Sequence, residues 1–309
     1  MTTSRSVSRH PMLEAELRRT LIRSRRFEKI SRAHRFATSP IRVVFPKLLK
    51  LAKMTWETRA RTFWGGTMNV ILPEVVSMQI WLHGFFEADV CLYMMNSLKE
   101  GMTFIDVGGH FGYFTLLGSY LVGGTGKVLS FEPMPATYDQ LRKNVARNAP
   151  HPNIDAIRSA GYSENTTITF HDFGLEDSAF NSAFGSRKVT SEGAASPLGR
   201  AVPVDARKID DVLENKNIRG VDLIKIDAES SELFVLYGLL QTIRMYKPGI
   251  IVEVGDVDGT APSSSSREIV EWLKEQGYDA YEACGGELVL HEAKERYEYG
   301  NLLFLAKRR

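Results

Sequence analysis

The chain has almost no cysteine: Cys91 and Cys284 are the two thiols in 309 residues. Two thiols cannot form a disulfide framework or, by themselves, a zinc site, and their scarcity favours a cytoplasmic location. No apolar run approaches the ~18 residues of a transmembrane helix, and no signal-peptide core follows the N-terminus. A composition of 43% hydrophobic and 25% charged residues predicts a soluble protein with one large or two small domains.

Acidic residues are scarce in the first 62 positions, which hold sixteen Lys or Arg against four Glu and no Asp. The rest of the chain is net acidic, with 33 acidic against 23 basic residues, so a nucleic-acid groove across it is disfavoured. We interpret residues 1–62 as a basic helical extension and residues 63–309 as the main domain.

The extension contains two basic, amphipathic stretches, Leu13–Ile30 and Ile41–Met54. Such a segment suits contact with anionic lipid, or an arm that binds nucleic acid or a protein partner. Its Arg- and Ser-rich composition also resembles a mitochondrial presequence. A solvated helical extension or an oligomer contact is an alternative of equal weight, so peripheral association of a cytoplasmic protein with a membrane stays open.

The stretch that organises the chain lacks the G-x-G-x-x-G of a dinucleotide site. Phe104-Ile-Asp-Val-Gly-Gly-His-Phe-Gly112 runs from a buried-type strand into a glycine-rich turn, in the order D-x-G-x-x-x-G. The carboxylate of Asp106 would repel a pyrophosphate but suits a ligand with an amino group or a sulfonium. Glu132, at the end of the next strand, is placed to accept both hydrogen bonds of a ribose diol. This pair favours S-adenosylmethionine (SAM) over NAD, the alternative being a turn that binds nothing.

Strand-like and helix-like segments alternate over the main domain, which predicts an α/β fold with a mostly parallel, Rossmann-like sheet and helices on both faces. Ligands of such sheets bind beyond the carboxyl ends of the strands, where four carboxylates are expected: Asp106, Glu132, Asp227 and Asp256. The segment Leu175–Leu198 is predicted to be a mobile loop, and its polar side chains suit either substrate contact or flexibility: Ser178, Asn181, Ser182 and Ser186. An aromatic cluster before the sheet suits core packing or a pocket mouth: Trp64, Trp81, Phe85 and Phe86.

Three spaced blocks resemble the FkbM-type SAM-dependent methyltransferases: Asp106-Val-Gly-Gly-His-Phe-Gly112, Phe131-Glu-Pro-Met-Pro135 and Leu223-Ile-Lys-Ile-Asp-Ala-Glu229. The resemblance runs from about Gly66 to Asp256 and implies a class I methyltransferase fold with a seven-stranded sheet. It implies that Glu132 holds the ribose of SAM and that Asp106, Gly108 and Gly112 hold its methionine end. Gly109 and His110, in the same turn, complete the predicted cofactor-binding set. Two departures stand out, because His110 replaces the usual Asn and Ser230-Ser231 replace the usual glycine and small residue.

The resemblance also places Asp227 and Glu229 beside the transferred methyl group, and many relatives methylate hydroxyls of sugars or polyketide-like products. We therefore expect Asp227 to be the general base or to orient the nucleophile, with Glu229 assisting. Glu253, inside an apolar strand, is expected to orient Lys225 or the substrate, because a lone buried carboxylate is costly. Close carboxylates could instead hold Mg²⁺, and Glu229 could simply cap the following helix.

Two further classes compete with a methyltransferase acting on a hydroxyl of a sugar, glycolipid or natural product. An NAD-type oxidoreductase would use Glu132 in the same way, but the chain has no obvious Tyr-x-x-x-Lys pair. A non-catalytic partner- or membrane-binding protein on a degenerate fold would work through residues 1–62. The N-P-P-Y motif of amino-methylating enzymes is also absent, which favours oxygen as the acceptor atom.

Overall fold

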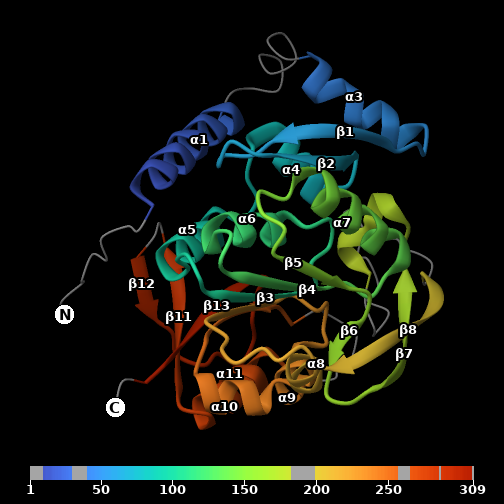
Figure 1. The fold of residues 1–309 in the computed structure, drawn as a ribbon. Coiled ribbons are helices and arrows are strands. Elements are labelled where there is room, and N and C mark those ends of the chain that lie inside the picture. Colours follow the sequence, from blue (N-terminus) through green and yellow to red (C-terminus); the bar gives the residue numbers. More distant parts are fainter. Residues whose placement is uncertain (1–9, 30–39, 182–198, 257–264, 285–286, 308–309) are drawn as a thin grey trace.

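A mixed central sheet runs through the protein in the order β12-β11-β13-β10-β9-β3-β4-β5 (Figure 1). The computed structural model describes residues 10–29, 40–181, 199–256, 265–284 and 287–307. Five strands are parallel: β3 (Thr103–Val107), β4 (Lys127–Phe131), β5 (Ile154–Ile157), β9 (Leu223–Ile226) and β10 (Gly249–Val254). Three antiparallel strands follow: β13 (Gly300–Ala306), β11 (Tyr278–Cys284) and β12 (Glu287–Leu290). The mostly parallel sheet is confirmed, with an eighth strand because β12 extends the hairpin as an exposed edge.

Helices cover both faces of this sheet (Figure 1). One layer contains α5 (Ala88–Ser97), α6 (Tyr113–Val122) and α7 (Pro135–Asn148), and the other contains α8 (Ile209–Asn215), α9 (Glu232–Gly238), α10 (Leu240–Tyr246) and α11 (Ser266–Glu275). Side chains alternate between the two cores along each strand, so Phe104 packs under the first layer and Ile105 under the second. Both are fully buried, which explains why the strand sequence is almost continuously apolar.

The predicted helix from Leu233 to Ile243 is two helices, α9 and α10, which meet at Leu239. Gly238 ends α9, and a Cβ there would lie 1.9 Å from the carbonyl oxygen of Tyr162. The break therefore accompanies a close approach between this helix and β6 (Ala160–Tyr162). The sequence pattern could not show it, because the contact joins segments far apart in the chain.

Two smaller sheets border the central one. The first contains β6, β7 (Thr166–Asp172) and β8 (Arg200–Lys208), so the predicted strand Ile154–Ala160 ends early, at Ile157. The second is a hairpin of β1 (Trp56–Arg61) and β2 (Thr67–Leu72), followed by α4 (Val75–His83). The hairpin spans the expected domain boundary at residue 62, so β1 pairs directly with the main domain.

The N-terminal extension contains two described helices, α1 (Pro11–Lys29) and α3 (Pro40–Leu51). Leu17 of α1 is fully buried, and Leu13 and Leu21 pack beside it against the main core. Figure 1 shows α1 lying next to α5, whereas α3 lies over β1. Among the described residues, no helix combines the length and the apolar character needed to cross a membrane.

Candidate active site

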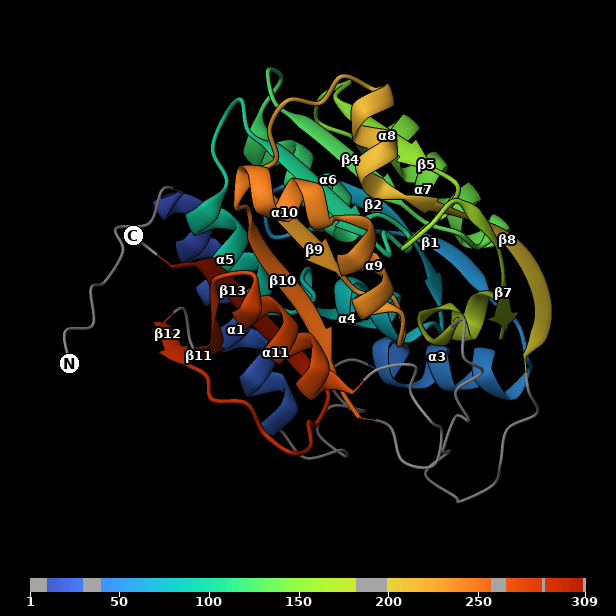
Figure 2. The same ribbon diagram turned by 90° about the horizontal axis from the view of Figure 1, so that it is seen from below.

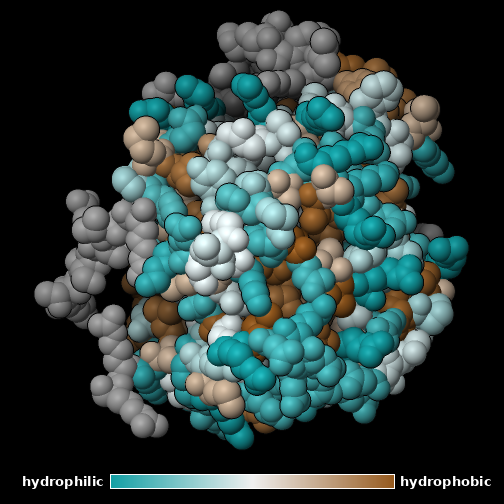
Figure 3. Space-filling model, in the orientation of Figure 1, coloured by the Kyte–Doolittle hydropathy of each residue, from teal (hydrophilic) through white to brown (hydrophobic). Residues whose placement is uncertain are grey.

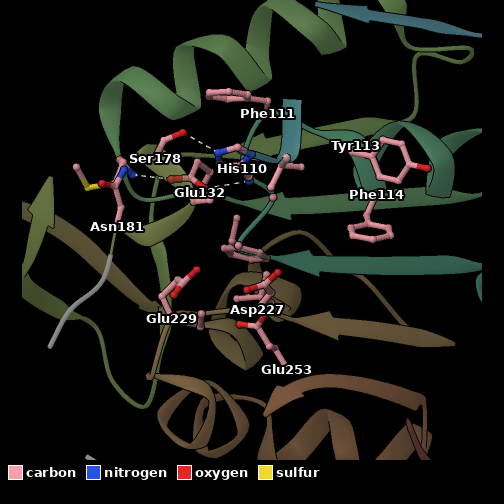
Figure 4. A pocket seen from close by; sticks show the side chains of 18 of the residues that line it. His110, Phe111, Tyr113, Phe114, Glu132, Ser178, Asn181, Asp227, Glu229 and Glu253 are labelled. Carbon is pink, nitrogen blue, oxygen red and sulfur yellow. Dashed lines mark hydrogen bonds between the residues drawn. The ribbon is translucent and has the colours of Figure 1, made fainter. Parts of the chain in front are cut away.

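A cavity of about 300 Å³ lies at the carboxyl ends of β3, β4, β9 and β10, within the size range of small-molecule sites. Its walls come from the turn after β3, the ends of the neighbouring strands, α4, and a short 3₁₀ helix, η1 (Leu175–Phe180). Figure 4 shows the charged and aromatic side chains converging on this space. The position agrees with the ligand position expected for an open α/β sheet.

The glycine-rich turn is packed tightly against two neighbouring strands. A Cβ at Gly108, whose φ is +82°, would lie 1.7 Å from the carbonyl oxygen of Asp227. A Cβ at Gly109 would lie 2.2 Å from the Oγ of Ser130. Both distances are too short for any side chain, so the glycines are required by the fold itself as well as by any ligand.

Glu132 directly follows β4, and its carboxylate is held by the backbone. The N–H of His110 donates to Oε2 and the N–H of Met134 donates to Oε1, each at 3.0 Å. Burial raises the pKa of Glu132 to about 7, against the lowering effect of these hydrogen bonds. Apolar side chains line the cavity beside it, among them Met134 and Phe170. The cavity thus combines the carboxylate of Glu132, which is held in a fixed position, with an apolar wall that suits a planar nucleobase.

His110 connects the turn to η1. Its Nε2 lies 2.8 Å from the Oγ of Ser178, and its ring stacks on Phe111 with centroids 4.0 Å apart (Figure 4). Burial lowers the pKa of His110, which favours the neutral imidazole. Its φ of +48° is the left-handed conformation, which Asn and His adopt more readily than most residues. The replacement of Asn therefore preserves the backbone and adds a ring that contacts η1.

The predicted polar loop contributes Ser178 and Asn181 to the cavity wall. Ser178 also donates to the carbonyl of Leu175, and the Oδ1 of Asn181 accepts from the N–H of Phe173 at 2.8 Å. Both side chains are buried, so this part of the segment is folded against the site. Ser182 and Ser186 lie outside the described residues.

The buried Lys225 and the partly exposed Asp227, whose side chain is 23% exposed, form an ion pair at the end of β9. The Nζ of Lys225, a residue only 1% exposed, lies 2.7 Å from Oδ2 of Asp227 and 4.7 Å from the centre of the Phe114 ring. Burial alone would raise the pKa of Asp227, but the charge and hydrogen bond of Lys225 outweigh it and lower that pKa. Asp227 is therefore ionised.

Two more carboxyls, Glu229 and Glu253, lie beside Asp227 (Figure 4). One oxygen from each of the three falls within 4.8 Å of the others. Burial, followed by the charge of Asp227, raises the pKa of both glutamates well above the usual range. Glu253 also shares a hydrogen bond with Asp227, in which the protonated Glu253 is the donor. The cluster thus combines one ionised carboxylate with two carboxyl groups whose surroundings favour the protonated form.

Glu229 does not cap the following helix, so that interpretation is wrong. The Oε1 of Glu232 instead accepts from the N–H groups of Ala228 and Ser230, at 3.0 and 3.1 Å. Glu229 and Ser230 have φ values of +47° and +78°. The left-handed backbone turns the Glu229 side chain into the cavity, which it lines.

Seven of the nine predicted site residues line the cavity: Gly108, Gly109, His110, Glu132, Asp227, Glu229 and Glu253. The other two, Asp106 and Gly112, do not. Asp106 is 1% exposed and accepts from the Oγ1 of Thr115 at 2.6 Å, while its Oδ1 has no hydrogen-bond partner among the described residues. Asp256 is structural, since it accepts from the backbone of Ser266 and Tyr297.

Sequence reasoning missed Glu87 and Tyr299. Glu87 precedes α5, accepts from Asn301 at 2.8 Å, and contributes to the electrostatics of Lys225 and Glu253. Burial raises the pKa of Glu87, with Lys225 opposing. Tyr299 lines the cavity on the side of Glu229 and Glu253. Neither belongs to a motif, and both lie in segments far from β9 in sequence; Tyr299 lines the cavity, whereas Glu87 acts on it through its charge.

Of the four aromatic residues expected at a pocket mouth or in the core, Phe86 lines the cavity. Trp64 and Phe85 are buried in the core, and Trp81 packs against it half-buried. Core packing therefore explains most of the cluster.

Comparison with known proteins gives one family. Residues 106–280, more than half of the chain, match the methyltransferase FkbM domain. The chain is 27% identical over 206 residues to methyltransferase sdnD of Sordaria araneosa, covering 60% of this chain and 77% of that protein. It is 26% identical over 198 residues to 31-O-demethyl-FK506 methyltransferase FkbM of Streptomyces tacrolimicus, covering 59% and 74%.

A third relative is hexuronic acid methyltransferase AglP of Haloferax volcanii, 27% identical over 168 residues and covering 54% of this chain and 62% of that protein. Among solved structures, methyltransferase FkbM from Methylobacillus flagellatus KT aligns with a TM-score of 0.41 and 16% identity, over 67% of this chain and 44% of that chain. The matched domain begins at Asp106 and includes the glycine-rich turn, Glu132 and the Asp227 cluster. The chain therefore belongs to the FkbM family of SAM-dependent methyltransferases.

Proposed function

We propose that the protein transfers the methyl group of SAM to a hydroxyl of a sugar, glycolipid or natural-product acceptor. The observation that carries this proposal is Asp227, an ionised carboxylate in the same cavity as Glu132. Two relatives support the acceptor class, since one is named for a 31-O-demethyl-FK506 substrate and another for a hexuronic acid.

The residues of the cavity fit SAM. Glu132 offers two fixed acceptor oxygens for ribose hydroxyls, and the adjoining apolar wall suits adenine. We assign the methionine end to the turn after β3, where the buried Oδ1 of Asp106 has no hydrogen-bond partner among the described residues. Gly108, Gly109, His110 and Gly112 would form the rest of that end. When bound, SAM supplies a methyl group made electrophilic by its sulfonium, and the acidic lining suits that positive charge.

The acceptor is activated by the chain's own carboxyl groups. Asp227 accepts the proton of the attacking hydroxyl, or a hydrogen bond from it, and so fixes the direction of attack. Lys225 keeps Asp227 ionised and prevents its side chain from rotating. The protonated Glu229 and Glu253 are placed to donate to further oxygens of a polyhydroxylated acceptor.

The same three carboxyls are close enough to bind Mg²⁺, which would lower the pKa of the acceptor hydroxyl. Lys225 argues against this arrangement, because its ammonium group already neutralises the ionised member of the cluster. We therefore propose acid–base catalysis without a metal and treat Mg²⁺ as the alternative.

Calorimetric titration with SAM, S-adenosylhomocysteine and NAD tests the cofactor site. We expect binding of the first two and none of NAD. Loss of two hydrogen bonds to a charged group, each ~1.5–3 kcal/mol, should weaken binding at least about 100-fold in Glu132→Ala. Glu164→Ala, at an exposed glutamate, is the control. Preference for NAD, or unchanged affinity in Glu132→Ala, would contradict the assignment.

A further inference from the structure

The outer side of α3 and the start of β1 form a surface that is both apolar and basic. Four large apolar side chains are exposed there within nine residues: Leu48 at 55%, Leu51 at 83%, Met54 at 59% and Trp56 at 54%. Leu48 and Leu51 are three positions apart, so they share one side of the helix. Leu49 faces inward and is buried, and Phe45 packs edge-on against Trp56 with ring centroids 6.0 Å apart. One side of α3 is therefore packed against the protein, while its other apolar side, with Leu48 and Leu51, stays exposed to water.

Three exposed lysines, Lys47, Lys50 and Lys53, surround these side chains. They take part in no ion pair among the described residues, and no acidic residue lies between positions 40 and 56. The next acid, Glu57, contacts Lys143 and Asn69 on the adjoining hairpin. We call Lys47, Leu48, Lys50, Leu51, Lys53, Met54 and Trp56 the α3 surface. Figure 3 shows brown apolar atoms beside teal ones at the upper right, where α3 lies.

This combination selects one kind of partner. Isolated exposed apolar residues are ordinary, but an apolar helix side bordered by lysines and a tryptophan is the pattern of helices that lie in a bilayer interface. A second copy of the chain would bring three lysines against three lysines. A nucleic acid would satisfy the lysines but leave Leu48, Leu51 and Met54 in water.

We propose that the α3 surface docks the protein on an anionic lipid bilayer, with the leucines entering the headgroup region and the lysines facing lipid phosphates. The α1 helix takes no part in this contact through its leucines, since they pack on the main core. Docking is thus assigned to α3 and the start of β1 and not to the whole basic extension.

The α3 surface lies on the side of the molecule toward which β9 and β10 run, as Figure 2 shows. Those strand ends carry the cavity, and β2, which pairs with β1, contributes Met68 to its wall. Docking therefore brings the site close to the bilayer. If the proposed O-methylation is correct, this orientation favours a lipid-linked acceptor such as a glycolipid over a freely diffusing one. Only this inference about the acceptor rests on the proposed function; the docking itself does not.

Vesicle co-sedimentation of the full chain tests the docking directly. The probes are vesicles of phosphatidylcholine alone and of phosphatidylcholine mixed with phosphatidylglycerol. We expect binding to the mixed vesicles, weakening as salt is added. Lys47→Glu/Lys50→Glu/Lys53→Glu should bind at least about 100-fold more weakly, because each lysine near an anionic surface contributes about fivefold. Leu48→Ser/Leu51→Ser should also lose binding.

Matched controls change the same residue types elsewhere on the surface. Lys99→Glu/Lys127→Glu and Met245→Ser alter exposed side chains outside the α3 surface and should bind vesicles like the wild type. Calorimetric titration with S-adenosylhomocysteine shows that each variant keeps its fold and its cofactor site, independently of any acceptor.

Three results would overturn the proposal. The first is a wild type that stays in solution with both vesicle types, and the second is equal binding by the α3 variants and the controls. The third is a wild-type oligomer that dissociates in Leu48→Ser/Leu51→Ser, which would assign the surface to a second copy of the chain. Failure of S-adenosylhomocysteine binding in the wild type would count against the proposed function and not against docking.

Discussion

The Nζ of Lys225 lies 2.7 Å from Oδ2 of Asp227, with the lysine almost completely buried. Glu87 and Asp106 also act on this ammonium group, and together with Asp227 they raise the pKa of Lys225 despite its burial. A single cation is thus shared by several carboxyl groups from different strands and helices. This explains why the pKa of Asp227 is lowered while burial and the charge of Asp227 raise the pKa values of Glu229 and Glu253.

Lys225→Met is expected to destabilise the protein strongly. The change leaves the ionised Asp227 without its cation; because the Asp227 side chain is 23% exposed, the cost falls below that of a fully buried pair, to roughly 1–3 kcal/mol of unfolding free energy. Urea denaturation measures the loss. In the double variant Lys225→Met/Asp227→Asn the unpaired charge is gone, so much of the stability should return. If the single and double variants were equally stable, the loss of stability in Lys225→Met would not come from the unpaired charge of Asp227.

Glu232 should make stability fall as pH rises. Burial raises its pKa from 4.5 to about 7, so between these values the folded protein holds a proton that the unfolded chain has lost. Stability from this group is therefore complete below its unfolded pKa and declines through this window, by up to about 1.4 kcal/mol per pH unit.

Glu232→Gln tests this directly, because its amide oxygen still accepts from Ala228 and Ser230 while the titration is removed. Denaturant unfolding near pH 5 and near pH 7 should show a smaller decline than in the wild type. Glu292→Gln, at an exposed site, should decline like the wild type. A wild type that gains stability across this interval through Glu232 would reverse the sign and contradict the assignment.

Local sequence pattern was enough for the elements that carry the cavity. The helix at Val75–His83 has the predicted bounds. Glu132 directly follows its strand, which ends one residue earlier than expected, at Phe131, because the apolar run and the acid after it are adjacent in the chain. The parallel order of β3, β4 and β9 then brings Glu132 and Asp227 to one cavity. These features depend on neighbours in sequence and on a fold with few topological choices.

Contacts between distant segments account for what could not be predicted. Glu87 meets Asn301 across 214 positions, and the break at Leu239 accompanies the approach of Gly238 to Tyr162. Helix α9 has no side-chain cap, and Glu229 points into the cavity instead, because two left-handed residues redirect the chain there. The spacing of apolar residues along the sequence does not reveal such contacts.

Ser230→Gly should stabilise the protein. Ser230 has a φ of +78°, a conformation that costs an L-residue roughly 1 kcal/mol and glycine almost nothing. Thermal and urea unfolding should therefore show a gain of about that size. Ser231→Gly, at a φ of −111°, has no such strain to relieve and is expected to gain nothing. A loss of stability in Ser230→Gly would show that contacts of the serine side chain outweigh the strain.

Asp227→Asn should separate catalysis from cofactor binding. The amide cannot accept a proton, so turnover with an identified hydroxyl acceptor is expected to fall about 100-fold or more. S-adenosylhomocysteine affinity should stay within about threefold, since the proposed function assigns the ribose contacts to Glu132. Calorimetry and a methyl-transfer assay measure the two effects. Wild-type turnover in this variant would remove Asp227 from the role of base.

Removal of divalent metal should leave the enzyme unchanged. A cation bound by Asp227, Glu229 and Glu253 would have to displace the ammonium of Lys225 from 2.7 Å and remove the protons from both glutamates, whose pKa values burial raises. Each step opposes binding near neutral pH. We therefore expect EDTA treatment to change neither S-adenosylhomocysteine affinity nor turnover, and Mn²⁺ titration followed by electron paramagnetic resonance to show no bound ion. Inactivation by EDTA that Mg²⁺ restores, together with loss of Mn²⁺ binding in Glu229→Gln/Glu253→Gln, would make the three carboxyls metal ligands and replace the acid–base mechanism.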